Sequence, residues 1–158
     1  MIGNLETISG TITKPVGERY PQLRVERGEV YFFNKITGKI KKAKKGEAYF
    51  IGKERNRKNP VTIGRKSADT IGKKDVLLAE KYRYASRSHC EIFFSIDENA
   101  YFLVDYSLNG TLINGSKIGG NRVHERRKLK HKDLIEIPAL GDKVKLIFLT
   151  RKVSLIEW

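Results

Sequence analysis

Short runs in which apolar residues occupy every second position recur along the chain. The first, third and fifth residues of Ile92–Ile96 and of Val144–Phe148 are apolar. Tyr101–Val104 and Leu134–Ile137 follow similar patterns. A period of two is typical of a β-strand with one mainly buried face. We therefore expect strands at these four places, with Ile92, Phe94 and Ile96 on the buried face of the first.

The upstream part of the chain has the same character. Val30–Asn34 and Lys39–Ile40 flank the turn-forming stretch Lys35–Gly38, which predicts a hairpin, and Ala48–Ile51 predicts a further strand. Only residues 73–81 and 125–132 have patterns that suit a short helix. Many short strands separated by Gly, Asn and Pro indicate an all-β fold, a sandwich or a barrel.

Two Asn-Gly dipeptides stand close together at Asn109-Gly110 and Asn114-Gly115. Both residue types tolerate a positive φ, which makes the dipeptide a strong tight-turn former. Only three residues separate the two dipeptides, too few for two full hairpins. We expect one of them to close a brief strand pair and the other to project a loop at the end of a sheet.

Charge narrows the choice of partner. The 158 residues include 32 Lys and Arg against 18 Asp and Glu, a formal net charge of +14, while 39% hydrophobic residues suit one folded domain plus an appendage. This balance favours acidic or phosphorylated partners. Residues 1–60 alone carry 14 basic and 6 acidic residues. Their runs Lys41–Lys45 and Lys53–Lys58 are either solvated strand edges or a nuclear-import or nucleic-acid patch.

Cysteine content and the N-terminal sequence bear on the compartment. A single cysteine, Cys90, excludes an internal disulfide and any zinc site built on two or more cysteines. The first residues resemble no secretory signal, and no apolar run is long enough to span a membrane. We expect a nuclear or cytoplasmic protein without a membrane partner.

Three polar clusters lie where apolar strands meet loops: Thr62–Arg65, Ser86–His89 and Asp105–Gly115. In a sandwich such loops converge at one end, where binding residues usually lie. Arg65 and Arg87 offer charged forks of donors, Ser86 offers a hydroxyl, and Asn109 can donate to and accept from a peptide backbone. A phosphate monoester carries about −1.5 to −2 charges and three acceptor oxygens, which two arginines and a hydroxyl would match.

These residues also resemble a known pattern. Gly64-Arg65, then Ser86-Arg87-Ser88-His89, then Asn109-Gly110-Thr111 with Asn114-Gly115 resembles the motif set of the forkhead-associated (FHA) domain, over roughly residues 48–150. The resemblance implies a twisted two-sheet β-sandwich that recognises phosphothreonine in a partner's unstructured segment. The loop Lys81–His89 is most similar to that of checkpoint-kinase FHA domains, which implies a cell-cycle or DNA-damage context.

The resemblance also assigns roles to individual residues. Arg65, Ser86 and Arg87 are implied to bind the phosphate. Asn109, with Leu108 and Tyr84, is implied to contact the peptide. Gly64, His89, Gly110 and Thr111 are implied to shape the loops rather than to touch the ligand.

The residues also bear on alternatives to a phosphopeptide module. His89 and Cys90 are adjacent in the chain and would point to opposite faces of a strand, so they make a poor catalytic pair. His124 and His131 have no neighbouring cysteines or paired carboxylates that would complete a metal site. Direct nucleic-acid binding through the basic N-terminal region stays open, with Tyr31, Phe32 and Phe33 available to stack on bases.

The sequence thus predicts an all-β protein in two parts. Residues 1–45 form a basic N-terminal extension or hairpin that either supplies the first strands or stands apart, and residues 46–158 form the FHA-like sandwich. We expect a non-catalytic module in a signalling protein, without cofactor, metal or small-molecule substrate. Its expected partners are phosphothreonine-containing protein segments, with a nucleic-acid-binding β domain as the alternative.

Overall fold

The computed structural model describes residues 19–152, and every regular element within that range is a β-strand. The strands are β1 (Gln22–Arg27), β2 (Val30–Phe33), β3 (Ile40–Ala43), β4 (Ala48–Phe50), β5 (Val61–Arg65), β6 (Val76–Leu78), β7 (Cys90–Ser95), β8 (Ala100–Asp105), β9 (Thr111–Ile113), β10 (Ser116–Ile118), β11 (Glu125–Lys128), β12 (Asp133–Ile137) and β13 (Val144–Leu149).

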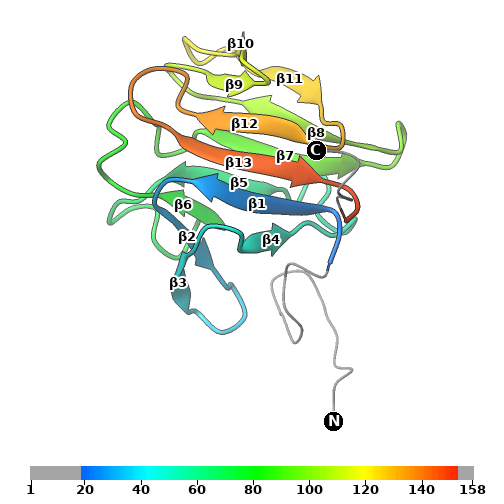
Figure 1. Ribbon diagram of the computed structural model, residues 1–158, viewed down its shortest axis with the longest axis horizontal. Coiled ribbons are helices and arrows are strands. Elements are labelled where there is room, and N and C mark those ends of the chain that lie inside the picture. Colours follow the sequence, from blue (N-terminus) through cyan, green and yellow to red (C-terminus); the bar gives the residue numbers. More distant parts are fainter. Residues whose placement is uncertain (1–18, 153–158) are drawn as a thin grey trace.

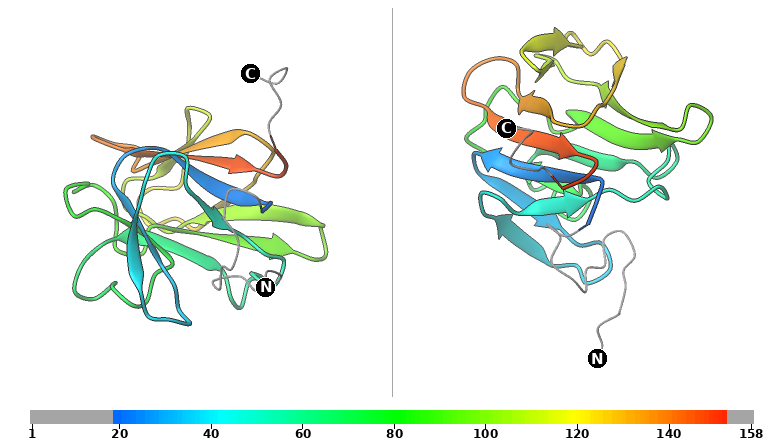
Figure 2. Two further views of the ribbon diagram at one scale, coloured as in Figure 1. Left: turned by 60° about the horizontal axis from the view of Figure 1, so that its bottom comes forward. Right: turned by 45° about the vertical axis from the view of Figure 1, so that its right-hand side comes forward.

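The strands form two sheets packed face to face (Figure 1). One sheet has the order β10-β9-β12-β13-β1-β4, and the other has the order β11-β8-β7-β5-β6-β2-β3. The turned view in Figure 2 separates the two layers, with β12 and β13 in one and β7 and β8 in the other. The predicted all-β, two-sheet sandwich is confirmed.

The core lies between the sheets and is built by the alternating residues. Ile92 on β7 and Leu146 and Phe148 on β13 are fully buried there, as the period of two predicts. The expectation for Ile96 is wrong, because β7 ends at Ser95 and Ile96 begins the turn to β8, where 83% of its surface is exposed. Apolar alternation carried the strand prediction one residue beyond its true end.

Both stretches with helical patterns contain strands instead. Residues 73–81 include β6, whose three residues Val76–Leu78 are all buried and which runs parallel to β5. Residues 125–132 include β11, which pairs antiparallel with β8 at the sheet edge. A helix this short is marginal by itself, so backbone pairing with a neighbouring strand decides the structure. Within residues 19–152 no helix is long and apolar enough to cross a membrane.

The basic N-terminal part contributes strands to both sheets. β1 pairs antiparallel with β13 on one side and with β4 on the other. β2 pairs with β6 and forms a hairpin with β3, from Val30 opposite Ala43 to Phe33 opposite Ile40. β3 is an edge strand whose Lys41 and Lys42 are exposed, which fits the tendency of edge strands to carry lysines. Residues 1–18 lie outside the described range.

The two Asn-Gly dipeptides play the two different parts that their spacing predicts. Asn114 and Gly115 both have positive φ, at 51° and 82°, and join β9 to β10, with Ile113 opposite Ser116. This is the two-residue hairpin turn that Asn-Gly favours. Asn109 and Gly110 instead lie in the loop between β8 and β9 at the end of the sheet.

A candidate anion-binding site at one end of the sandwich

Strand pairing brings the three polar clusters to the same end of the seven-stranded sheet. β7 runs antiparallel to both β5 and β8, with Cys90 opposite Ile63 on one side and opposite Asp105 on the other. The end of β5, the start of β7 and the end of β8 are therefore neighbours. The loops that carry Arg65, Ser86 and Asn109 meet at this point, as the sequence predicted for a sandwich.

Arg65 is hydrogen-bonded to the loop before β7 through both its backbone and its side chain. Its backbone N–H donates to the carbonyl of Ser86 at 2.9 Å, and its Nη1 donates to the carbonyls of Ala85 at 2.5 Å and Arg83 at 3.1 Å. Within residues 19–152 the guanidinium forms no ion pair with a carboxylate. Arg65 is therefore oriented by neutral carbonyls and keeps its charge available for a ligand.

Gly64 allows the two segments to approach this closely. A Cβ built on Gly64 would overlap the carbonyl oxygen of Arg87. Any side chain at position 64 would push the Ser86–His89 loop away from β5. This close approach is consistent with a structural rather than a ligand-contacting role for Gly64.

Two hydrogen bonds tie the Ser86 loop to the Asn109 loop. The backbone N–H of Leu108 donates to Ser86 Oγ at 3.1 Å, and Asn109 Nδ2 donates to the carbonyl of Tyr84 at 2.9 Å. The Leu108 and Tyr84 side chains are about half exposed, at 47% and 51%. These two bonds join four of the five residues predicted for phosphate and peptide contact on the two loops: Tyr84, Ser86, Leu108 and Asn109.

Ser86 and Asn109 keep hydrogen-bonding capacity for a ligand. Ser86 Oγ accepts the bond from Leu108, so its hydroxyl hydrogen is available to donate. Asn109 uses one amide N–H on Tyr84, and its Oδ1 has no partner within the described part of the chain. A serine hydroxyl and an amide held in this way suit an anionic group on a peptide backbone.

His89 anchors the Ser86 loop through a hydrogen bond. It is fully buried, and its Nδ1 accepts a hydrogen bond from the backbone N–H of Ser86 at 3.0 Å. Its Nε2 lies 3.0 Å from the carbonyl of Gly110 and 3.1 Å from Thr111 Oγ1. This pattern requires a neutral imidazole with its hydrogen on Nε2. Burial lowers the pKa of His89 below its usual 6.5, against an opposing effect of Asp105, which agrees with the neutral form.

Asp105 and Ser107 complete this buried network, and sequence reasoning assigned them no role. Asp105 accepts hydrogen bonds from Thr111 Oγ1 at 2.6 Å and from the backbone N–H and hydroxyl of Ser107, both at 2.9 Å. Ser107 Oγ in turn accepts from the N–H of Gly110 at 2.7 Å. An Asp that ends an apolar strand two residues before a Ser is a local signal for such a turn. The predicted structural positions Gly110 and Thr111 belong to this network.

Arg87 differs from Arg65 in that it already has an acidic partner. Its Nη1 lies 2.9 Å from Asp69 Oδ2, and both side chains are more than half exposed. Lys74 Nζ adds a further cation by donating to Ser88 Oγ at 2.9 Å. The loop Lys66–Lys74 therefore lies beside the predicted phosphate ligands and supplies both an acidic and a basic group.

The arrangement offers little for catalysis by His89 and Cys90. Cys90 is buried in the core, and burial raises the pKa of its thiol well above the usual range, so a thiolate is disfavoured. His89 uses both ring nitrogens within the protein. No three potential metal-ligating His, Cys, Asp or Glu side chains cluster among residues 19–152.

Comparison with known proteins agrees with this geometry. Residues 61–138 match the family model of the FHA domain. The kinase-interacting FHA domain of a kinase-associated protein phosphatase from Arabidopsis is similar in structure, with 26% identity and a TM-score of 0.55, over 84% of this chain and 95% of that chain. No match was found among curated protein sequences.

A second solved relative is the MEK1 FHA domain, with 24% identity, a TM-score of 0.54, and coverage of 83% of this chain and 90% of that chain. The same domain in complex with a HOP1 phosphothreonine peptide is 23% identical, with a TM-score of 0.52, over 84% of this chain and 98% of that chain. These two share the sandwich fold. The family match covers β5 to β12, including all three polar clusters, and the chain therefore contains a forkhead-associated domain.

Proposed function

We propose that this protein is a non-catalytic module that binds phosphothreonine-containing segments of other proteins through the loops around Arg65, Ser86 and Asn109. The observation that carries the proposal is the junction of Arg65 with the Ser86 loop. There a guanidinium without a carboxylate partner in residues 19–152 lies beside a serine whose hydroxyl hydrogen is available. Each charge-assisted hydrogen bond to a phosphate would contribute about 1.5–3 kcal/mol.

The family supports this proposal. FHA domains are binding modules rather than enzymes, and the MEK1 FHA domain has been solved with a HOP1 phosphothreonine peptide. In this chain Arg65 and Ser86 would bind the phosphate, Arg87 would add a basic contact, and Asn109 would hold the peptide main chain. We place the module in a signalling protein, with the checkpoint-type loop Lys81–His89 as the basis for a cell-cycle or DNA-damage context.

The test is fluorescence anisotropy with a degenerate phosphothreonine peptide library and its unphosphorylated twin. We expect micromolar binding that requires the phosphate. Arg65→Ala should weaken binding by at least about tenfold, since it removes charge-assisted hydrogen bonds. Lys58→Ala is the control, because it removes one exposed charge from the loop at the other end of β5. Equal binding of both libraries, unchanged in Arg65→Ala, would refute the proposal.

The same measurements separate phosphopeptide binding from nucleic-acid binding through the basic N-terminal strands. Lys41, Lys42, Lys44 and Lys45 are exposed on and after β3. If these lysines bind nucleic acid, reversing their charges abolishes oligonucleotide binding, and affinity falls steeply with salt. If the Arg65 site is the functional one, the same reversals change phosphopeptide affinity little.

A further inference from the structure

A second cluster of buried apolar side chains lies outside the main core. Phe93, Ala100 and Phe102 form this cluster, with Val104 packed against it. Neighbouring strand residues point to opposite faces, so Phe93 lies on the other side of β7 from Ile92 and Phe94, which belong to the main core. Phe93 of β7 and the alternate residues Ala100, Phe102 and Val104 of β8 therefore form an apolar surface on the face turned away from the second sheet.

Arginine side chains cover this outward cluster. The guanidinium of Arg57 lies 5.4 Å from the centroid of the Phe93 ring, and that of Arg126 lies 4.4 Å from the Phe102 ring. Phe93 and Phe102 are consequently only 3% and 5% exposed. Arg57 precedes β5 and Arg126 is on β11, so two distant segments place guanidinium groups over one aromatic surface.

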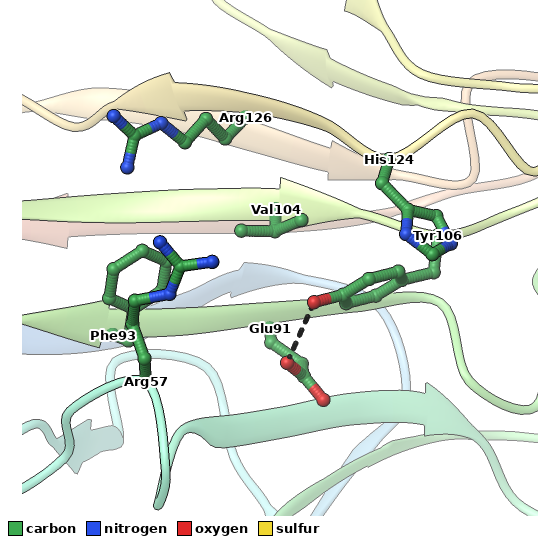
Figure 3. Close-up of a pocket in the computed structure, with 7 residues that line it drawn as sticks. All are labelled: Arg57, Glu91, Phe93, Val104, Tyr106, His124 and Arg126. Carbon is green, nitrogen blue, oxygen red and sulfur yellow. Dashed lines mark hydrogen bonds between the residues drawn. The ribbon is translucent and has the colours of Figure 1, made fainter.

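A pocket of about 210 Å³ opens between these groups (Figure 3). It is lined by Arg57, Glu91, Phe93, Val104, Tyr106, His124 and Arg126. In Figure 3 the two guanidinium groups lie toward one end of the pocket, and the Tyr106 and His124 rings lie toward the other, with Val104 between them. The Tyr106 and His124 rings pack edge to face, with 4.5 Å between their centroids. The pocket thus has a cationic part and an aromatic part.

The charges around the pocket favour an anionic occupant. Its one carboxylate, Glu91, accepts a hydrogen bond from the Tyr106 hydroxyl at 3.2 Å. Arg126 Nη2 lies 3.0 Å from Glu98 Oε2, and both side chains are almost half exposed. Ion pairs at the surface contribute little free energy. Arg57 has no carboxylate partner within residues 19–152. The Arg57 guanidinium therefore lies over a ring without an acidic partner among the described residues, whereas Arg126 lies over a ring and also forms a surface ion pair.

We propose that this pocket binds an acidic segment of a partner protein, with a carboxylate between Arg57 and Arg126 and an aromatic side chain against Tyr106 and His124. The site goes beyond the phosphothreonine function, because none of its residues is a phosphate ligand of that function. A volume of about 210 Å³ suits one or two side chains.

The test is an NMR titration of the ¹⁵N-labelled chain with the peptide Gly-Glu-Glu-Tyr-Glu-Glu-Gly, compared with the same peptide carrying Gln for every Glu. We expect the acidic peptide to shift the backbone amides of Phe93, Val104, Tyr106 and Arg126, and to bind at least tenfold more tightly than the Gln peptide. Arg65→Ala should leave this response unchanged, so failure of the phosphothreonine site and failure of this pocket are distinguishable.

The variant Arg57→Met/Arg126→Met removes both charges while an unbranched side chain still covers each ring. We expect at least a tenfold loss of affinity for the acidic peptide, against less than threefold for the matched control Lys39→Met/Lys45→Met, whose two exposed lysines flank β3. Three results would overturn the proposal: equal responses to the Glu and Gln peptides, unchanged affinity in the arginine variant, or shifts of these amides by oligothymidylate alone.

Discussion

At the scale of single residues, we expect the least replaceable position of the proposed phosphate site to be Gly64, which has no side chain. We expect Gly64→Ala to weaken phosphothreonine-peptide binding by more than tenfold, because a Cβ there would overlap the Arg87 carbonyl and displace the Ser86 loop. Fluorescence anisotropy measures the loss. Gly38→Ala is the matched control, since Gly38 has a positive φ of 74° but open space around it. That control should lose about 1 kcal/mol of stability and keep its affinity, and equal affinities for the two variants would contradict the steric argument.

His89 makes stability depend on pH in a definite direction. Burial lowers its pKa in the folded state below the usual 6.5, so the unfolded chain binds a proton first as the pH falls. The contribution of His89 is therefore complete above pH 6.5 and is lost as the pH falls from there through the folded-state pKa. Protonation would also remove the acceptor for the Ser86 N–H.

Urea unfolding at pH 7.5 and 5.5 checks this expectation. The free energy of unfolding should fall more between the two pH values in the wild type than in His89→Asn. All other ionisable groups are common to both proteins, so the difference reports on His89. An identical fall in both proteins would show that His89 does not titrate differently in the folded and unfolded states.

At the scale of elements, we expect the loop between β5 and β6 to limit the affinity of the proposed phosphate site. Asp69 on this loop forms an exposed ion pair with Arg87 and would repel a phosphate bound beside it. Asp69→Asn should therefore raise phosphopeptide affinity by up to about fivefold, the range of an exposed charge interaction. The gain should shrink as salt increases. Asp97→Asn, on the turn after β7, is the control, and an equal gain there would mean that only net charge matters.

At the scale of the whole molecule, the basic N-terminal strands are integrated into both sheets. β1 lies between β13 and β4, and β2 lies between β6 and β3. A chain of residues 46–158, the domain boundary expected from the sequence, lacks all three N-terminal strands and leaves the buried edges of β13 and β6 unpaired. We expect it to show no cooperative unfolding transition in circular dichroism, whereas residues 19–158 should show one. A cooperative transition for residues 46–158 would mean that the later strands suffice.

Local pattern determined several strands and one tight turn of this molecule. Alternating apolar residues placed β7, β8, β12 and β13, because a strand's two faces meet different surroundings whatever its partner is. The Asn114-Gly115 turn was predictable because positive φ is a property of those two residues. The prediction that Arg65, Ser86 and Asn109 bind the ligand came from the resemblance of their chemistry and order to those of a family, and it stays a prediction.

Only the tertiary structure decided which groups meet. The pairing of Cys90 with both Ile63 and Asp105 gathers three loops far apart in the sequence. The tertiary structure also determined that β6 and β11 are strands. It paired Arg87 with Asp69 and placed Arg57 and Arg126 over one aromatic surface. Such short strands gain their stability from partners distant in the chain. Contacts of this kind depend on register and packing between segments, which no local pattern of residues encodes.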